Sequence, residues 1–556
     1  MRLRLTNKQT VILMFLAVMD CLVVCGLGGI VASQTFKAAA PPSPTVAVTP
    51  TVVTPTPRPT ATPRPPAPTW TPSLTPTPLG MDLLYTFAPA RCTFDVPEGA
   101  NVTCGYAVLP ETRGDPPADL VHLAVAVYHS IAPDPAPDPV IYLSGGPGGA
   151  ALDDMATLYK VFVAPLLAER DVIVFDQRGV GKSQPALECY EYTVTVDRDL
   201  ERHFTVEDKA REYPLAFRRC RDRLTGRGIN LAAYTSANSA SDVRDLATLL
   251  GYDQVNLYGV SYGTRLALTV MRDYPDIVRS AVLDSVEPIE EPVYNRQAET
   301  TARLLRQLFD GCAADRVCRT RYPNLENVFY ALADRLDVEP VMIWPRSVGK
   351  LYKIQLTGDL LTSGIFHAAY VNPILPYLPR MIDDAASGDY ELAEWIMGIS
   401  VGAESSISIG MMLSVNCHEE AFATTPEQII ADYEAYPNTA GSAYGMVFGD
   451  PRTLFTICEE WGAAPFDPRE GQPVVSDIPA LIIAGQYDPI TPPDYGRQVA
   501  AQLSRSYFYE YPGQGHGVSL WASDCAYGMA RAFLRDPLSA PDAACIAEMT
   551  GPEFIE

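Results

Sequence analysis

The sequence predicts an α/β fold: a mostly parallel sheet with a helical cap insertion, preceded by a transmembrane helix and a Pro/Thr-rich stalk. Short apolar stretches typical of buried strands alternate with helical stretches between residues 121 and 511. This is the pattern of parallel strands connected by helices. An apolar run of 22 residues and a proline-rich segment precede the alternation. The chain is therefore expected to consist of an anchor, a linker and a large globular body.

The N-terminal segment is predicted to be a membrane anchor. Three cations, the last of them Lys8, precede an apolar run at 11–32 that contains a single charge, Asp20. Such a run can span a bilayer, whereas the apolar part of a signal peptide is about 7–15 residues long. The leading cations predict a cytoplasmic N-terminus and an external body. A cleaved signal peptide and a secreted body are the alternative, because Val31-Ala32-Ser33 offers small residues for cleavage.

The linker is predicted to be an extended stalk. Residues 41–78 include fourteen prolines and many threonines, a composition that cannot form a core and favours polyproline-like structure. At about 3.1 Å per residue, some forty residues would hold the following body up to roughly 120 Å from the membrane.

The composition limits the classes of partner that the body can bind. The net charge is −24 and the hydrophobic share is 47%, so the body can build a sizeable core. Residues 1–80 hold six Lys or Arg and one Asp, which leaves −29 on the remainder. Such an acidic body argues against nucleic acid and anionic lipid as partners.

The body is expected to start with two antiparallel strands at 92–110 and 121–130. Almost two hundred residues with helical character, for example 299–309 and 325–335, interrupt the later alternation. This insertion is predicted to cap the site, which lies at the carboxyl ends of the strands. Parallel strands are expected near 140–144, 171–176, 254–258, 280–285, 480–485 and 506–511, with helices such as 239–251 and 494–503. The expected divisions are 1–35 (anchor or signal), 36–80 (linker), 81–287 (first core part), 288–470 (cap) and 471–556 (second core part).

The most informative stretch is Gly259-Val260-Ser261-Tyr262-Gly263, which lies between an apolar strand at 254–258 and a helical run at 264–271. A serine at a sharp strand-to-helix turn has strained backbone and needs small neighbours, which the two glycines provide. The helix N-terminus behind it offers free N–H groups to a developing oxyanion. The context predicts that Ser261 is a nucleophile, where the motif alone would indicate an ordinary turn.

A serine nucleophile needs a base and an orienting acid. Of the six histidines, three follow Ser261. His516 lies in a glycine-rich loop after a strand-like run, whereas His367 lies in an apolar helical run and is expected to be a packed or surface side chain. Asp488 ends a buried strand 28 residues before His516, which leaves room for one helix and one strand. We predict a triad of Ser261, Asp488 and His516; for Asp488 the alternative is a turn residue before a proline.

The oxyanion hole requires a second N–H beside that of Tyr262. A buried strand at 139–143 is followed by Ser144 and then Gly145-Gly146-Pro147-Gly148-Gly149. Such a glycine run lets the backbone approach a substrate carbonyl closely. We predict Gly146 as the donor, with the choice among residues 145–148 open and a flexible loop as the alternative.

Ten cysteines lie in the body, and an even number in an exported domain predicts disulfides. Zinc binding is the alternative to disulfides. However, there is no paired Cys-x-x-Cys, and His418 beside Cys417 is a single ligand-like pair. We therefore expect no metal and no cofactor. The spacing favours sequential pairs, although connectivity cannot be deduced from sequence. These pairs are Cys92–Cys104, Cys189–Cys220, Cys312–Cys318, Cys417–Cys458 and Cys525–Cys545.

A set of motifs spread along the body carries a family resemblance: Gly145–Gly149, the run 175–183, Tyr234–Asp242, Gly259–Gly263, Cys417, Cys458–Trp461, Asp488 and Gly515–Gly517. With these motifs the chain resembles the prolyl aminopeptidase family of α/β-hydrolases over roughly residues 85–550, and most of all its secreted tripeptidyl-aminopeptidase-like branch. Ser144 is a departure, because many relatives have histidine there. In the family the loop at Asp176 and Arg178 is structural, so both are expected to be scaffold.

The resemblance implies an α/β-hydrolase fold and an extracytoplasmic serine exopeptidase that cleaves near the free N-terminus of peptides. The family binds the substrate ammonium with acidic residues from the cap, and Glu419 and Glu420 lie in the corresponding region. For these two residues a solvated acidic pair is the alternative. The competing functions are a carboxylesterase with the same triad and a non-catalytic surface binding module. The oligomeric state is left open.

Overall fold

A computed structural model describes residues 84–113, 119–347, 349–404, 407–521 and 524–555. The predicted membrane segment and stalk lie outside these residues. Within the described ranges no helix is both long and apolar enough to cross a membrane.

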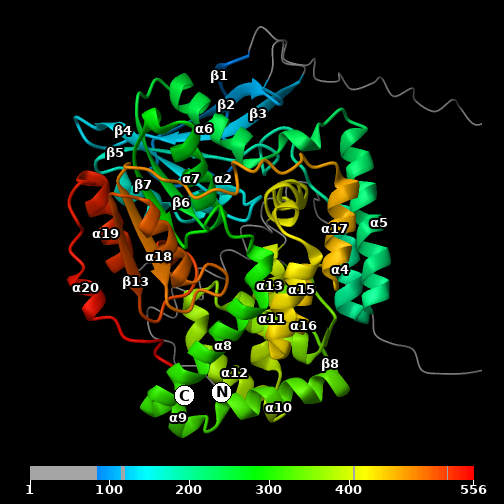
Figure 1. The fold of residues 1–556 in the computed structure, drawn as a ribbon. Coiled ribbons are helices and arrows are strands. Elements are labelled where there is room, and N and C mark those ends of the chain that lie inside the picture. The colour runs from blue at the N-terminus through cyan, green and yellow to red at the C-terminus, as the bar shows by residue number, and fades with distance from the viewer. Residues whose placement is uncertain (1–83, 114–118, 348, 405–406, 522–523, 556) are drawn as a thin grey trace, which may run out of the picture.

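A mixed sheet forms the body; the described residues contribute nine strands in the order β1-β2-β3-β5-β4-β6-β7-β12-β13. From β5 to β13 neighbouring strands are parallel, while β1, β2 and β3 extend one edge in antiparallel fashion. Figure 1 shows this sheet beside a group of helices that includes α8, α11 and α15. The strands are Thr86–Pro89 (β1), Val102–Pro110 (β2), Leu120–Tyr128 (β3), Ala136–Leu143 (β4), Arg170–Phe175 (β5), Val255–Val260 (β6), Val278–Asp284 (β7), Ala480–Gly485 (β12) and Ser506–Tyr511 (β13).

Most helices follow the sheet strands or belong to the cap. Those of the core are Ala151–Thr157 (α2), Ala164–Leu166 (α3), Ser236–Leu249 (α6), Tyr262–Asp273 (α7), Pro493–Gln502 (α18), Asp524–Arg535 (α19) and Ala544–Ala547 (α20). Those of the cap region are Tyr190–Arg202 (α4), Val206–Thr225 (α5), Gln297–Ala314 (α8), Arg316–Arg321 (α9), Leu325–Val338 (α10), Gly358–Ala368 (α11), Leu378–Ala386 (α12), Glu391–Glu404 (α13), Ile409–Val415 (α14), Pro426–Ala435 (α15), Pro437–Met446 (α16) and Pro451–Trp461 (α17).

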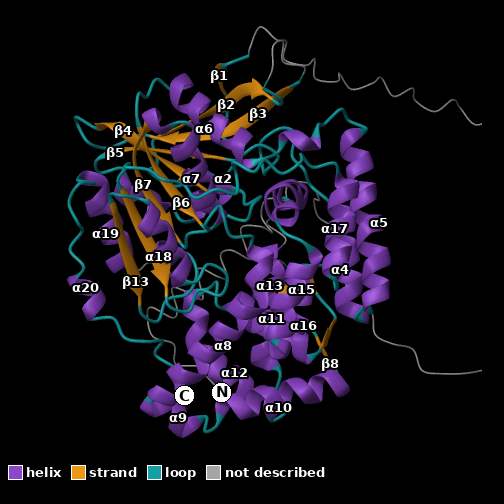
Figure 2. Cartoon of the chain, viewed as in Figure 1, coloured by secondary structure: helices purple, strands orange, loops and turns teal. Residues whose placement is uncertain are grey.

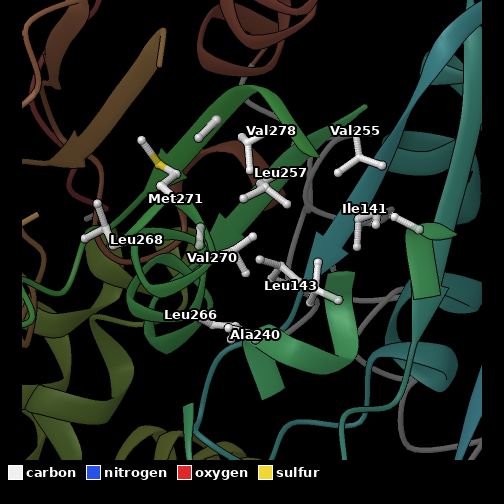
Figure 3. Close-up of a cluster of buried hydrophobic side chains, with 14 of the residues drawn as sticks. Ile141, Leu143, Ala240, Val255, Leu257, Leu266, Leu268, Val270, Met271 and Val278 are labelled. Carbon is white, nitrogen blue, oxygen red and sulfur yellow. The ribbon is translucent and has the colours of Figure 1, made fainter. Parts of the chain in front are cut away.

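Apolar side chains of the strands alternate between the two faces of the sheet. On β6, Val255 and Leu257 pack with residues of α6, α7 and α18 (Figure 3). Tyr258 and Val260 join the cluster of the opposite face, which includes residues of α2 and α19. Because helices cover both faces, as is usual for parallel strands, the open positions are the loops at the strand ends.

Two insertions build the cap. The larger lies between β7 and β12 and was expected. It contains α8 to α17 and one short, interrupted hairpin, in which β8 pairs with β11 and β9 pairs with β10. The smaller, which was not expected, lies between β5 and β6, where α5 packs against α17 (Figure 2). Arg218 of α5 is 2.8 Å from Glu460 of α17. The hairpin strands are Val341–Ile343 (β8), Arg346–Ser347 (β9), Lys350–Leu351 (β10) and Ile354–Leu356 (β11).

The strand expected over 92–110 begins only at Val102. Ala100 donates its N–H to the carbonyl of Pro97, and Gly99 between them has a φ of +81°. This turn prevents the preceding residues from continuing the strand, because proline and a left-handed glycine interrupt a ladder.

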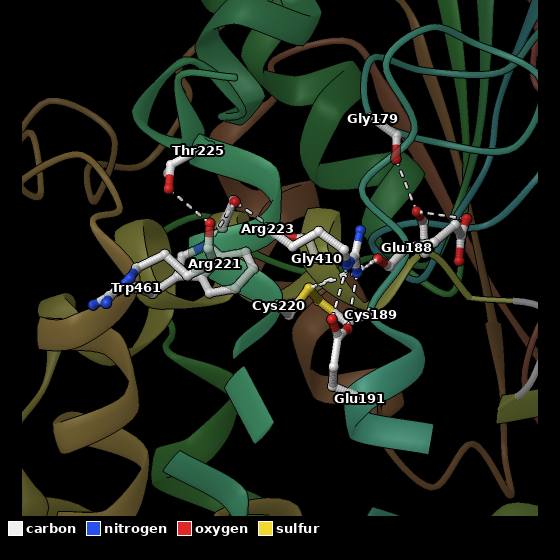
Figure 4. Close-up of a disulfide and its surroundings, with 12 residues drawn as sticks. Gly179, Glu188, Cys189, Glu191, Cys220, Arg221, Arg223, Thr225, Gly410 and Trp461 are labelled. Carbon is white, nitrogen blue, oxygen red and sulfur yellow. Dashed lines mark hydrogen bonds and ion pairs between the residues drawn. A yellow bond between two sulfur atoms is a disulfide. The ribbon is translucent and has the colours of Figure 1, made fainter. Parts of the chain in front are cut away.

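Five disulfides are present in the described part of the chain, and the sequential pairing is confirmed. One of them, Cys189–Cys220, joins the start of α4 to α5 (Figure 4). Beside it, Arg223 lies 2.8 Å from Glu191. Five disulfides indicate an extracytoplasmic location, because reducing compartments keep thiols free.

Candidate active site

Ser261 lies at the turn between β6 and α7, as the sequence predicts. Its backbone has φ +57° and ψ −131°, a strained conformation for a residue with a side chain. A Cβ atom on Gly259 would lie 2.4 Å from the carbonyl oxygen of Gly263, and one on Gly263 would lie 2.0 Å from that of Leu143. Both glycines are therefore required by the close approach of backbones. Ser261 itself remains partly exposed at the strand end.

Asp488 and His516 lie in neighbouring loops after β12 and β13, and the structure brings their side chains together. Nδ1 of His516 is 2.9 Å from Oδ2 of Asp488. Asp488 is fully buried, and His516 is 7% exposed. Among the described residues, Ser261 Oγ makes no hydrogen bond with His516, and contacts of this kind often tighten only when substrate binds.

The polar surroundings of Asp488 and His516 include Thr491, which the sequence did not indicate as a site residue. Thr491 donates its N–H and its hydroxyl to Asp488, each at 2.8 Å, and its hydroxyl is 3.2 Å from Nδ1 of His516. The ring of Tyr370, from the cap, lies 4.6 Å from the imidazole of His516. Thr491 follows Asp488-Pro489, where the sequence alone indicates only a turn.

The electrostatics of the pair favour an ionised acid. Burial opposes the charge on Asp488, but His516 and the donors from Thr491 hold the pKa of Asp488 below its usual value. Burial would likewise lower the pKa of the His516 imidazole, but Asp488, with smaller effects of Asp284 and Glu287, raises it above 6.5. An imidazole with this pKa can accept a proton and return it near neutral pH.

The glycine loop lies directly against Ser261. A Cβ atom on Gly145 would be 2.9 Å from Cβ of Ser261, and Gly146 has a φ of +117° that favours glycine. Within the described chain, neither Gly146 nor Tyr262 donates its N–H to a protein acceptor. Both groups are thus free to bind an oxyanion. Ser408 of the cap donates its N–H to the carbonyl of Gly148 at 2.9 Å, which connects the loop to the cap.

Asp176 and Arg178 have structural surroundings. Asp176 accepts N–H groups from Leu152 and Lys182. The buried guanidinium of Arg178 donates to both carboxylate oxygens of Asp242 at 2.7 Å. These side chains tie loops together and leave no donor aimed at Ser261.

The two other late histidines lie elsewhere. His367 lies in α11, half-buried, with Nδ1 2.8 Å from the carbonyl oxygen of Ser363. His418 is buried, with Nδ1 2.9 Å from the carbonyl oxygen of Ala464 and Nε2 2.6 Å from Glu470. Both nitrogens of His418 are therefore engaged within the cap.

Glu419 and Glu420 are buried rather than solvated. Each is 2% exposed. Glu419 accepts the N–H and hydroxyl of Ser236 at 2.6 and 2.7 Å and the Nε–H of Arg265 at 3.0 Å. Glu420 accepts the N–H of Val293 at 2.5 Å and lies 2.7 Å from Arg265. The pair forms a bridge between the cap and helix α7.

A third carboxylate, Glu287, completes this cluster. It lies 3.5 Å from Nη1 of Arg265, and its side chain is 14% exposed, against 2% for the other members. Its charge also acts on His516. Burial raises the pKa of Glu420 to about 8, and it raises that of Glu287 as well. Three carboxylates thus share one guanidinium, and Glu287 is the member nearest to solvent.

The arrangement is suited to acyl transfer. It supplies a strained serine, an imidazole held by a buried carboxylate, and two free N–H groups beside the serine. In the described ranges no group of three or more His, Cys, Asp or Glu side chains is arranged to hold a metal ion.

Comparison with known proteins gives two family matches. The family described as the α/β hydrolase fold matches residues 138–357, and the family described as TAP-like protein matches residues 445–545. The serine protease Hip1 of Mycobacterium tuberculosis is 24% identical over 473 residues, which is 81% of this chain and 88% of that protein. The tripeptidyl aminopeptidase of Streptomyces coelicolor is 30% identical over 190 residues, or 33% of this chain and 35% of that protein.

These matches contain the strand-to-helix turn at Ser261 in the first family and the loops of Asp488 and His516 in the second. The chain is an α/β serine hydrolase with a TAP-like region, and it is distantly homologous to tripeptidyl aminopeptidase and to the serine protease Hip1.

Proposed function

We propose that this protein is an extracytoplasmic serine exopeptidase that hydrolyses peptide bonds near the free N-terminus of peptides. The observation that supports this best is the acidic cluster of Glu287, Glu419 and Glu420 around Arg265, whose most exposed member acts electrostatically on His516. An ester substrate offers no charge for such a cluster, whereas a peptide N-terminus does.

The proposed reaction proceeds through an acyl-enzyme. Ser261 Oγ attacks the scissile carbonyl carbon while Nε2 of His516 takes the hydroxyl proton. The N–H groups of Gly146 and Tyr262 bind the oxyanion. His516 then gives its proton to the departing amine as the C–N bond breaks. Water, deprotonated by His516, attacks the acyl-enzyme and regenerates Ser261, while Asp488 keeps the imidazole oriented throughout.

The charge on the cluster explains how a free N-terminus would be selected. Glu419 is saturated by donors from Ser236 and Arg265. Glu420 accepts the N–H of Val293 and lies 2.7 Å from Arg265. The three carboxylates share a single guanidinium, so the cluster has more acidic than basic groups. Glu287 is left as the acceptor for a substrate ammonium, in a charge-assisted contact. In this proposal Glu419 and Glu420 hold Arg265 in place.

The cap supports an exopeptidase rather than an endoprotease. Cap residues contact the loops around the site: Ser408 bonds to the carbonyl of Gly148, and Ala369 accepts the N–H of His516 at 3.3 Å. The side chain of Asn372 accepts the N–H of Gly515 at 2.5 Å. A site covered from two sides admits a chain end more readily than the middle of a folded chain.

We expect Glu287→Gln to lower kcat/KM for free-amine tripeptidyl substrates roughly ten- to a hundredfold, because a charge-assisted contact of about 1.5–3 kcal/mol is lost. N-acetylated peptides and short acyl esters should be hydrolysed at unchanged rates. The measurement is kcat/KM with matched chromogenic substrates on residues 81–556. Glu290→Gln is the matched control, because Glu290 bonds to Gln498 and Gln502 instead of Arg265.

Equal losses on free and blocked substrates would contradict the assignment of Glu287. A wild-type enzyme that prefers acyl esters or acetylated peptides would favour the carboxylesterase alternative. A wild-type protein that is inert to all of these substrates, and to a fluorophosphonate, would favour the surface binding module.

We also infer that residues 11–32 anchor the protein in the cell membrane and that residues 41–78 act as a spacer. The full chain should remain in the membrane pellet after an alkaline carbonate wash, while a variant beginning at residue 81 should appear in the supernatant. Detection of a mature N-terminus at or after Ser33 in the medium would favour the secreted alternative.

A further inference from the structure

Asp284 is a fully buried carboxylate at the end of β7 that the proposed reaction does not use. It lies between the turn that carries Ser261 and the loop that carries His516. Its backbone carbonyl accepts the N–H of Ser261 at 3.0 Å, and its side chain faces the loop that follows His516.

Donors from the histidine loop saturate the carboxylate. Val518 donates its N–H to Oδ1 at 3.1 Å, and Ser519 donates its N–H and hydroxyl to Oδ2 at 2.8 and 2.5 Å. The adjacent Ser285, at φ +60°, accepts the N–H of Gly517 at 2.8 Å. The three residues after His516 are thus bound, one after another, to the end of β7.

We propose that Asp284 is a positioning residue, which keeps the His516 loop in register with Ser261 by bonding to both. This inference rests on the proposed serine hydrolase reaction and goes beyond its triad. The structural reason is that β7 lies between β6, which precedes Ser261, and β12, which precedes Asp488. One residue at the end of this central strand bonds to the nucleophile backbone on one side and to the base loop on the other.

A purely structural role would not require a carboxylate at this point. Burial raises the pKa of Asp284 to about 6, although the hydrogen bonds from Ser519 act in the opposite direction. The carboxyl group is therefore ionised at neutral pH. A buried charge costs desolvation free energy, which an apolar residue at this position would avoid. Its negative charge also raises the pKa of His516, together with Asp488 and Glu287. Tyr370, from the cap, is a further titratable group that lies against the imidazole.

We expect Asp284→Asn to lower kcat about ten- to a hundredfold with KM changed by less than about threefold. An amide must turn its NH2 toward the donors of Val518 or Ser519, and a small displacement of a base is costly in rate. Loss of the charge should also shift the acid limb of kcat/KM to lower pH, because it lowers the pKa of His516. Asp432→Asn is the matched control: this cap carboxylate accepts the N–H of Ala298 at 2.8 Å and has a pKa of about 6.

The measurements are kcat, KM, the pH profile and the thermal midpoint of each variant. A kcat of Asp284→Asn within about twofold of wild type, or an unshifted acid limb, would overturn the proposal. If this variant fails to fold, Ser519→Ala removes the hydroxyl donor alone and should lower kcat at least about threefold; no loss there would also overturn it. A wild-type protein without any hydrolase activity would instead contradict the proposed function.

Discussion

Ser261→Ala should abolish turnover, with a loss of about four or more orders of magnitude in kcat, and should also abolish labelling by a fluorophosphonate. The variant removes only the atom that attacks the carbonyl. The fold should be unaffected, because Ser261 Oγ has no hydrogen-bond partner in the described chain and the strained turn depends on Gly259 and Gly263. Circular dichroism and the thermal midpoint check that the variant is folded.

A nearby hydroxyl serves as the matched control for this change. Ser519→Ala removes a buried hydroxyl on the histidine loop, yet it should still be labelled by the probe, although more slowly. Covalent labelling of Ser261→Ala at the wild-type rate would contradict the nucleophile assignment.

His516→Ala and Asp488→Asn should each lower kcat by about three to four orders of magnitude, with a much smaller effect on KM. His516→Ala removes the imidazole, which is the group that moves the proton. Asp488→Asn keeps the shape of the side chain, but its amide cannot accept a hydrogen bond from Nδ1–H of His516 and also accept both donors of Thr491.

The other late histidines provide controls. His367→Ala and His418→Ala should leave kcat within a few-fold of wild type, because their nitrogens bond to Ser363 and to Ala464 and Glu470. A crippling loss in His418→Ala, with His516→Ala still active, would refute the proposed triad.

The sequence could predict the strand ends because the chemistry there needs unusual residues. Gly259 and Gly263 tolerate approaches that no side chain allows, and the glycine run at 145–149 does the same beside Ser261. The strands of the parallel sheet could also be predicted, since β12 and β13 were expected at the same residues at which they occur.

Long-range pairing is what the sequence could not reveal. Glu287 stands in an acidic stretch with Glu290 and Glu291, which resembles a solvated loop, and only the fold brings Arg265 to it. The same guanidinium explains why Glu419 and Glu420 are buried. Nothing in the sequence indicates that Asp284 faces Val518, because the contact joins residues more than two hundred positions apart.

The second cap insertion was missed for the same reason. Helices α4 and α5 follow a core strand, and neither has an apolar run that identifies its partner. In the structure α4 packs on α5, and α5 packs on α17, where Arg218 pairs with Glu460. Contacts of this kind depend on the path of the whole chain rather than on local pattern.

The most direct test of the central claim, that this protein is a serine hydrolase with Ser261 as its nucleophile, is peptide mapping of the fluorophosphonate adduct. We expect a single adduct on the tryptic peptide 245–265, at Ser261, which disappears in Ser261→Ala and forms far more slowly in His516→Ala. An adduct on any other residue, or a folded wild-type protein that stays unlabelled, would contradict it.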